Sequence, residues 1–332
     1  MSFVHTGHRN LSGLRAMALV LAATLLLAAC AGAPQLSPAE QPLSKETLML
    51  LGRKGMQSGA PIFVRIFKEE SELEVWKARD DGRFYHFKTY PICNWSGELG
   101  PKLQQGDKQA PEGFYSIKKY QMNPNSSFHV SFNLGYPNAY DKAHRRTGNF
   151  LMVHGKCRSA GCYAMTDALI EEIYALAREA FRGGQEQFQV HAFPFRMTDA
   201  NMERHKQNKW YRFWTTLKAG YDHFEEHRIP PNVAVCESRY IVNVAWPSKT
   251  KLNPVGRCPR FMHPQIEPFV PRPTDEQIAF QEFKAAGPKM RTVANNGMPT
   301  LVPYGVGMSS QNTSPNRSST FTSNPLSALG FN

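Results

Sequence analysis

Six short β-type segments precede a single long amphipathic helix in this chain, and this order restricts the fold more than any other feature. The helix is predicted from Asp167 to Arg182, where apolar residues recur on one stripe at helical spacing. Asp81-Gly82 lies between two β-type segments and predicts a hairpin, because glycine accepts the positive φ of a tight turn. The six segments are residues 62–67, 73–77, 84–88, 113–117, 128–134 and 149–153, and a further strand is predicted for Gln187–Phe193. Strands that outnumber helices in this way predict a β-rich α+β fold.

Two other helical stretches are predicted, at residues 46–59 and at residues 199–218, with Pro230 and Pro231 closing the second. Glycine- and proline-rich loops occupy residues 96–102 and 106–113. Beyond residue 264 the chain becomes rich in proline, serine and asparagine, with little apolar content towards its end, which predicts disorder.

The first residues have the pattern of an export signal. A positively charged start, with Arg9 and Arg15, precedes an uncharged apolar run at residues 16–29, which is too short to span a bilayer comfortably. The run ends in Leu-Ala-Ala-Cys at residues 27–30, which resembles the bacterial lipobox, so Cys30 is predicted to be acylated. Ala31 favours the outer over the inner membrane. The alternative is cleavage near residues 31–33 and a soluble secreted product.

Export determines how the basic charge is interpreted. Lysine and arginine total 39 against 27 acidic residues, a formal net charge of +12. In a bacterial envelope the anionic partners are cell-wall carboxylates and lipid head groups, so we expect no nucleic-acid partner. A merely solvated basic surface is the alternative interpretation.

An odd number of cysteines follows the predicted lipobox. Five of the six remain after Cys30, and an oxidising compartment permits disulfides, so at least one thiol stays unpaired within the monomer. Cys236 and Cys258 both lie in the C-terminal part and are the expected disulfide. Cys93 and Cys157 form either a second pair or two buried thiols.

Residues 152–167 contain the groups that suggest chemistry. A predicted strand ends in His154, a tight loop follows, and Cys162 is expected just ahead of the helix. A helix N-terminus stabilises a thiolate and lowers its pKa, and a nearby histidine can exchange the proton. Backbone N–H groups near Cys162 can hold an oxyanion, and Gly155 and Gly161 allow the backbone to approach a substrate closely.

Two other interpretations of this segment remain open. Cys157 and Cys162 could form a disulfide, which would remove the nucleophile. A zinc site could instead combine His154, Cys157, Cys162 and His191, although the spacing is not that of a known zinc finger. We expect no metal, and His191 by itself is expected to be a core or pocket residue.

His154-Gly155 followed by Ser159, Gly161 and Cys162 resembles the signature of the YkuD-type L,D-transpeptidases, whose histidine serves a cysteine nucleophile. The closer resemblance is to the YafK branch of that family, and it extends over residues 45–228. The motifs that carry it are residues 92–102, 136–141, 193–198, 213–214 and 220–221, while residues 106–107 and 110–115 resemble a segment of the broader family.

The resemblance implies a peptidoglycan substrate and no cofactor. Cys162 would attack a carbonyl of diaminopimelate in the stem peptide and form a thioester, with His154 as proton donor and acceptor. Hydrolysis that releases a wall-attached lipoprotein is the expected outcome, transpeptidation is the alternative, and a non-catalytic wall-binding lipoprotein is the alternative of another class. Supporting roles fall to Gly155, Ser159 and Gly161, and substrate-binding roles to Arg158 and Tyr163.

The chain departs from the broad family pattern at two positions. That family usually has a histidine or arginine at the position of Ala160 and an arginine at the position of Ala164. Its His-to-Cys loop is also usually longer. These departures make transpeptidation less expected and leave the histidine and cysteine intact. The predicted organisation is a signal peptide (1–29), a tether (30–45), a β-rich YkuD-like catalytic domain (46–198), a helical, disulfide-containing extension (199–264) and a disordered tail (265–332).

Overall fold

Two five-stranded sheets form the framework of the protein. The computed structural model describes residues 36–247, 251–271, 290–295 and 298–303. The first sheet has the order β3-β2-β1-β10-β5 and the second β4-β9-β8-β7-β6. All neighbouring strands run antiparallel except β1 with β10 and β8 with β9, which are parallel. The strands of the first sheet are β3 (Phe84–Pro91), β2 (Glu72–Ala78), β1 (Ile62–Phe67), β10 (Gln187–Phe193) and β5 (Gly113–Lys118), and those of the second are β4 (Asn94–Trp95), β9 (Tyr163–Ala164), β8 (Met152–His154), β7 (His129–Asn133) and β6 (Met122–Ser126).

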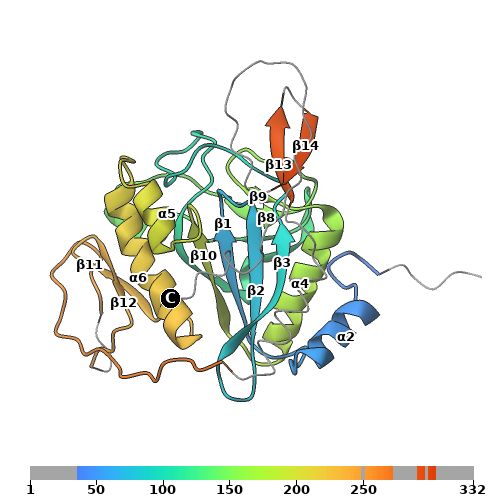
Figure 1. The fold of residues 1–332 in the computed structure, drawn as a ribbon, viewed down its shortest axis with the longest axis horizontal. Coiled ribbons are helices and arrows are strands. Elements are labelled where there is room, and N and C mark those ends of the chain that lie inside the picture. Colours follow the sequence, from blue (N-terminus) through green and yellow to red (C-terminus); the bar gives the residue numbers. More distant parts are fainter. Residues whose placement is uncertain (1–35, 248–250, 272–289, 296–297, 304–332) are drawn as a thin grey trace, which may run out of the picture. The chain divides into compact units, whose positions relative to one another are not determined.

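Helices α4 (Asp167–Arg182) and α6 (Tyr211–His227) lie on either side of the first sheet (Figure 1). The other helices are α2 (Lys45–Arg53), α3 (Ala139–Ala143) and α5 (Asp199–Arg204), with a 3₁₀ turn η1 (Lys119–Gln121) before β6. A small hairpin, β11 (Val233–Cys236) and β12 (Arg239–Val242), follows α6. Residues 283–332 form a separate unit, in which β13 (Met290–Asn295) pairs antiparallel with β14 (Met298–Pro303).

β1 is buried on both faces, which explains why its sequence is apolar throughout rather than alternating. Val64 and its neighbours two residues away join the main core, which combines both sheets and α4. Phe63 points the other way and packs on Phe224 of α6, with ring centroids 4.6 Å apart. The first sheet is therefore enclosed between α4 on one face and α6 on the other.

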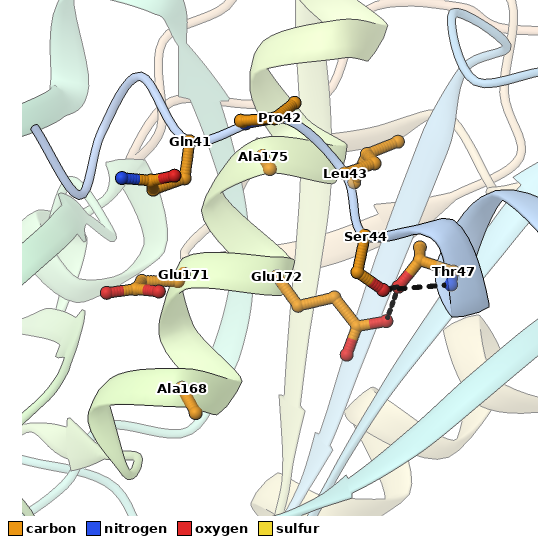
Figure 2. A pocket seen from close by; sticks show the side chains of 9 residues that line it. All are labelled: Gln41, Pro42, Leu43, Ser44, Thr47, Ala168, Glu171, Glu172 and Ala175. Carbon is orange, nitrogen blue, oxygen red and sulfur yellow. Dashed lines mark hydrogen bonds between the residues drawn. The ribbon is translucent and has the colours of Figure 1, made fainter. Parts of the chain in front are cut away.

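The N-terminal segment packs on the outer side of α4, and Figure 2 shows this contact. Ser44 caps α2, because its Oγ accepts the Thr47 N–H at 3.1 Å. The Thr47 hydroxyl donates to Glu172 of α4 at 2.8 Å. A pocket of about 200 Å³ lies here, lined by residues of the segment 41–47 and of α4 only. It is a feature of this packing, and it contains none of the residues that the sequence singled out for chemistry.

Most predicted elements are present, with four differences, one of which is that the strand predicted at residues 149–153 is β8 and begins only at Met152. The helix at residues 167–182 and the hairpin around Asp81-Gly82 are confirmed. Residues 199–218 were predicted as one helix, but the structure has α5 and α6, because Asn208 turns the chain by accepting the Trp210 N–H at 2.9 Å. The helix predicted at residues 46–59 ends at Arg53. The hairpin β13–β14 lies in the stretch for which disorder was expected.

The export signal, Cys30 and most of the C-terminal stretch fall outside the described residues. Within the ranges that are described, no helix combines the length and the apolar character needed to cross a membrane.

Candidate active site

His154 ends β8 on the face of the second sheet opposite the core. Val153 faces the core, and side chains alternate along a strand, so His154 faces away from it. The imidazole Nδ1 lies 2.7 Å from the carbonyl oxygen of Gly155. A carbonyl can only accept, so Nδ1 carries the proton and Nε2 has a free lone pair. Burial lowers the pKa of His154, which keeps the ring neutral and able to act as a base.

The loop after His154 has no space for a side chain at Gly155. A Cβ there would lie 2.5 Å from Asp167 Oδ1 and 3.1 Å from the carbonyl oxygen of Phe128. The same Asp167 oxygen accepts the Lys156 N–H at 2.7 Å, and the Met165 N–H donates to the His154 carbonyl at 2.7 Å. The start of α4 therefore fixes the backbone on which His154 is placed.

Cys162 lies beside Met152, on the same face of the sheet as His154. The pairing of Val153 with Tyr163 and of His154 with Ala164 sets this register. Cys162 Sγ accepts the Met152 N–H at 3.4 Å and donates to the Phe150 carbonyl at 3.6 Å. This register makes Cys162 and His154 diagonal neighbours across β8 and the start of β9. The structure shows no hydrogen bond between Sγ and the imidazole. Catalytic hydrogen bonds commonly tighten only when substrate binds.

The predicted position of Cys162 at a helix N-terminus is wrong. The strand β9 follows the cysteine directly, and α4 begins only at Asp167. A strand forms because Tyr163 belongs to the core while the backbone pairs with β8 and β4. Burial raises the pKa of the Cys162 thiol, opposed by the Met152 N–H and by the charge of Lys102. The thiol at rest is therefore neutral, and the helix dipole has no role in activating it.

The disulfides leave Cys162 as the free thiol. Cys93 is joined to Cys157, and Cys236 to Cys258, the pair that the sequence suggested. Among the cysteines in the described ranges, Cys162 alone lies outside a disulfide. The alternative pairing of Cys157 with Cys162 is therefore wrong, and the disulfide of Cys157 instead anchors the loop between His154 and Cys162.

The structure does not bring together the four residues of the zinc hypothesis. Cys157 is in a disulfide, and His191 lies on β10 in the other sheet. The ring of His191 packs edge-on against Phe63 at 4.7 Å and is fully buried. His191 is a core residue of the first sheet, on the face that packs against α6, whereas the candidate site lies on the second sheet.

Ser159 and Gly161 shape the turn before the cysteine. Ser159 Oγ donates to the Cys162 carbonyl at 2.8 Å and accepts the Gly161 N–H at 3.3 Å. Gly161 has a φ of +117°, which L side chains rarely adopt. Both residues thus shape the backbone around the thiol, and their supporting role in catalysis stays a prediction.

The two predicted substrate-binding residues differ in their surroundings. Arg158 is exposed on the loop between β8 and β9. Tyr163 is fully buried, and its hydroxyl donates to the Pro111 carbonyl at 2.7 Å. A substrate cannot contact a side chain in the core, so the substrate-binding role predicted for Tyr163 is wrong.

A buried ion pair that the sequence analysis missed holds the two glycine-rich loops together. Lys68 is fully buried, and its Nζ lies 3.0 Å from Glu112 Oε1. It also donates to the carbonyl oxygens of Glu98, Gly100 and Ala110, at 2.7, 3.0 and 3.1 Å. Glu112 accepts in addition from the Gly100 N–H and the Trp214 indole. Every donor of the lysine is satisfied, as a buried charge requires.

Lys102 is the second residue that the sequence analysis missed. It is 4% exposed, forms an ion pair with Asp107 and donates to the Gln104 carbonyl at 3.0 Å. Its positive charge lowers the pKa of Cys162 and so favours the thiolate. The sequence placed Lys102 in a family motif, but its nearness to the cysteine depends on a contact between loops far apart in the chain.

Comparisons with known proteins identify the family of the chain. The sequence profile of the YkuD L,D-transpeptidase catalytic domain matches residues 63–191. The Escherichia coli K-12 protein named "Putative L,D-transpeptidase YafK" is 45% identical over 233 residues, which cover 69% of this chain and 91% of the relative. The protein of the same name from E. coli O157:H7 has the same identity and coverage.

Two solved structures are more distantly similar. The helical cell shape determining protein Pgp2 of Campylobacter jejuni is 16% identical, covers 57% of this chain and 79% of its own, and has a TM-score of 0.33. Bd1075 of Bdellovibrio bacteriovorus is 16% identical, covers 58% and 64%, and has a TM-score of 0.29. Likenesses this low support no conclusion about function.

The chain belongs to the YkuD family of L,D-transpeptidases. It is thus a member of a family of peptidoglycan enzymes that work by acyl transfer, and within that family it is similar to YafK.

Proposed function

We propose that this protein cleaves an amide at diaminopimelate in peptidoglycan stem peptides, with Cys162 as nucleophile and His154 as acid and base. The observation that carries the proposal is the free Cys162 thiol on the same sheet face as His154, whose Nε2 is left unprotonated by the bond from Nδ1 to Gly155. The membership of the chain in the YkuD family supports the substrate class.

The first half of the reaction forms a thioester. Nε2 of His154 takes the proton of the Cys162 thiol as Sγ attacks the carbonyl carbon of the amide. When the tetrahedral intermediate collapses, the C–N bond breaks and the imidazolium gives its proton to the leaving amine. The acyl group then remains on Sγ.

The second half consumes water. Nε2 of His154 takes a proton from a water molecule as its oxygen attacks the thioester carbonyl. The C–S bond breaks, and the thiolate of Cys162 takes the proton back from the imidazolium. The sum of the two halves is one amide and one water converted into a carboxylic acid and an amine.

The residues around the pair favour water over a second peptide as acceptor. Ala164 is fully buried and pairs directly with His154, and Ala160 is exposed. Neither carries a charge that could hold the carboxylate of an incoming stem peptide, whereas water needs no such contact. A wall-attached lipoprotein joined to diaminopimelate through an amide would be released by this hydrolysis. True transpeptidation is the second candidate, supported by the family name alone.

Mass spectrometry of muropeptides tests the proposal. The purified protein is incubated with wall fragments carrying an amide-linked peptide on diaminopimelate, in water enriched in ¹⁸O. Hydrolysis places one ¹⁸O atom in the new carboxyl group, whereas transpeptidation joins two stem peptides and incorporates none.

Two cysteine variants complete this experiment. Cys162→Ala should abolish turnover, and Cys162→Ser should reduce it severely, because the hydroxyl is a weaker nucleophile. Full activity in the Cys162→Ala protein would overturn the assignment of the nucleophile. If the unaltered protein binds wall fragments but never changes their mass, the chain is a non-catalytic wall-binding protein instead.

The site of action is part of the proposal. The lipobox at residues 27–30 supports acylation of Cys30 and attachment to the outer membrane, with the catalytic domain in the periplasm. Cell fractionation and mass spectrometry of the mature N-terminus test this. The Cys30→Ala protein should lose the lipid and leave the membrane fraction, and normal processing with retained membrane attachment would contradict the proposal.

A further inference from the structure

Phe150 combines two features that its position in the fold does not explain. Its side chain is 69% exposed, and its backbone has a φ of +54°. A bulky residue in the left-handed region is uncommon and strained, because its Cβ comes too close to the following carbonyl oxygen. An isolated exposed phenylalanine is unremarkable by itself, but here no burial of the ring offsets the backbone cost.

Hydrogen bonds hold the chain on both sides of Phe150, but they do not require a phenylalanine there. Leu151 is 3% exposed and its carbonyl accepts the Leu134 N–H at 2.9 Å, which fixes the chain on the far side of Phe150. On the near side, the Thr147 N–H donates to the Leu103 carbonyl at 3.0 Å. Glycine or asparagine would satisfy the same backbone at lower cost. The phenyl ring therefore contributes nothing to the fold that glycine or asparagine at position 150 would not also provide.

Phe150 is also next to the candidate nucleophile. Its carbonyl oxygen accepts the hydrogen bond from Cys162 Sγ at 3.6 Å. The second glycine-rich loop lies against the turn that precedes the cysteine, since a Cβ on Gly161 would lie 3.4 Å from the Gln109 carbonyl oxygen. Phe150 is thus an exposed aromatic residue whose backbone carbonyl contacts the thiol.

We propose that the ring of Phe150 is a substrate-binding surface, which packs against the methylene chain of the diaminopimelate residue whose carbonyl Cys162 attacks. This inference rests on the proposed function and adds the contact that selects the acyl donor. The methylene chain of diaminopimelate is the long apolar part of the stem peptide, and an aromatic face is a suitable partner for it. Strained residues that persist in a fold concentrate at sites of ligand contact, as Phe150 does.

The glycine variant separates binding from folding. Phe150→Gly removes the ring and relieves the backbone strain, so its melting temperature should equal or exceed that of the unaltered protein. Its KM for diaminopimelate-containing wall fragments should rise about tenfold, which corresponds to the loss of one apolar contact of about 1.4 kcal/mol. The kcat should change little, and iodoacetamide should alkylate Cys162 at an unchanged rate, because the Phe150 carbonyl remains.

Two further variants sharpen the comparison. Phe150→Leu keeps an apolar surface and should restore most of the lost KM. Tyr120→Ala is the matched control, because Tyr120 is also an exposed aromatic residue, with 81% of its surface accessible. It lies in η1, just before β6, the edge strand of the second sheet, to which β8 also belongs. This variant should leave KM and kcat unchanged. If Phe150→Gly lowers stability, Phe150→Asn is measured in its place, because asparagine also tolerates the left-handed region.

An unchanged KM in the glycine or asparagine variant would overturn the inference, and so would a loss confined to kcat. These results are distinct from failure of the proposed function. If Cys162→Ala retains activity, the assigned nucleophile is wrong whatever Phe150 does, whereas an inactive Cys162→Ala protein with a normal Phe150→Gly protein refutes the substrate contact alone.

Discussion

At the scale of single residues, the environment of Cys162 sets how the enzyme must be activated. Burial favours the neutral thiol, and the Met152 N–H together with the charge of Lys102 only partly offsets this effect on the pKa. His154 is neutral for the same reason. Because both groups are neutral, His154 has to take the thiol proton as Cys162 attacks, which is general-base activation. A thiolate–imidazolium pair is not present before the substrate binds.

The alkylation rate of Cys162 should therefore rise with pH and reach its midpoint above that of an ordinary cysteine. The sign follows from burial, which disfavours the charged thiolate, so the thiol keeps its proton to higher pH. Iodoacetamide labelling followed by mass mapping, repeated across pH, measures this. Lys102→Gln should shift the midpoint further upward. A reactive plateau extending below pH 7 would instead demonstrate a stored ion pair.

The sequence indicated the proposed pair, His154 and Cys162, but not its structural setting. His154, Cys162, Ser159 and the glycines were found because they lie within one short segment. The helix-terminal position of the cysteine and the substrate-binding role of Tyr163 were wrong for one reason, which is that β9 pairs with β4, a strand about 70 residues earlier in the chain. A two-residue strand has no periodicity of its own, so only the partner strands reveal it.

At the scale of elements, the two glycine-rich loops depend on one buried lysine. Lys68 follows β1 and contacts Glu112, and the two residues are separated by 44 positions in the chain. From the sequence alone, a lysine that follows a strand is expected to be exposed to solvent, because lysine is almost never fully buried without a partner. The strands of the first sheet and α4 were predictable from local periodicity, whereas this contact and the break between α5 and α6 required tertiary structure.

Replacing Lys68 with methionine should lower the free energy of unfolding by about 3–5 kcal/mol, the usual cost of leaving a buried charge without its partner. The Glu112 carboxylate and the carbonyl oxygens of both loops would lose their donor. Lys88→Met is the control, because the side chain of Lys88 is 38% exposed in its pair with Glu172 and such pairs contribute about 0–1 kcal/mol. Urea denaturation compares the variants, and equal losses in the two would contradict the role of Lys68.

At the scale of the whole molecule, the contact between the first sheet and α6 contains histidines that cannot easily accept a proton. His191 of β10 is fully buried, and burial together with the charges of Arg65 and His223 lowers its pKa well below the ordinary value. Burial and the charge of His227 lower the pKa of His223 on α6 to about 4, with Glu226 opposing this effect. The Nδ1 of His191 and the Nε2 of His223 are buried without hydrogen-bond partners. Both rings are therefore neutral in the folded protein at neutral pH.

The folded protein should lose stability as the pH falls from about 6.5 towards 4. In this window the unfolded chain protonates these histidines near their ordinary pKa while the folded chain does not, so the unfolded state binds more protons and lowering the pH favours it. Each such histidine should contribute about 1.4 kcal/mol per pH unit. Urea denaturation at several pH values measures the slope, and His223→Gln should reduce it by the share of one proton. His263→Gln, at an exposed position, is the control. A stability that stays constant between pH 6.5 and 4.5, or a slope that His223→Gln leaves unaltered, would show that α6 docks on the sheet without excluding protons from these rings.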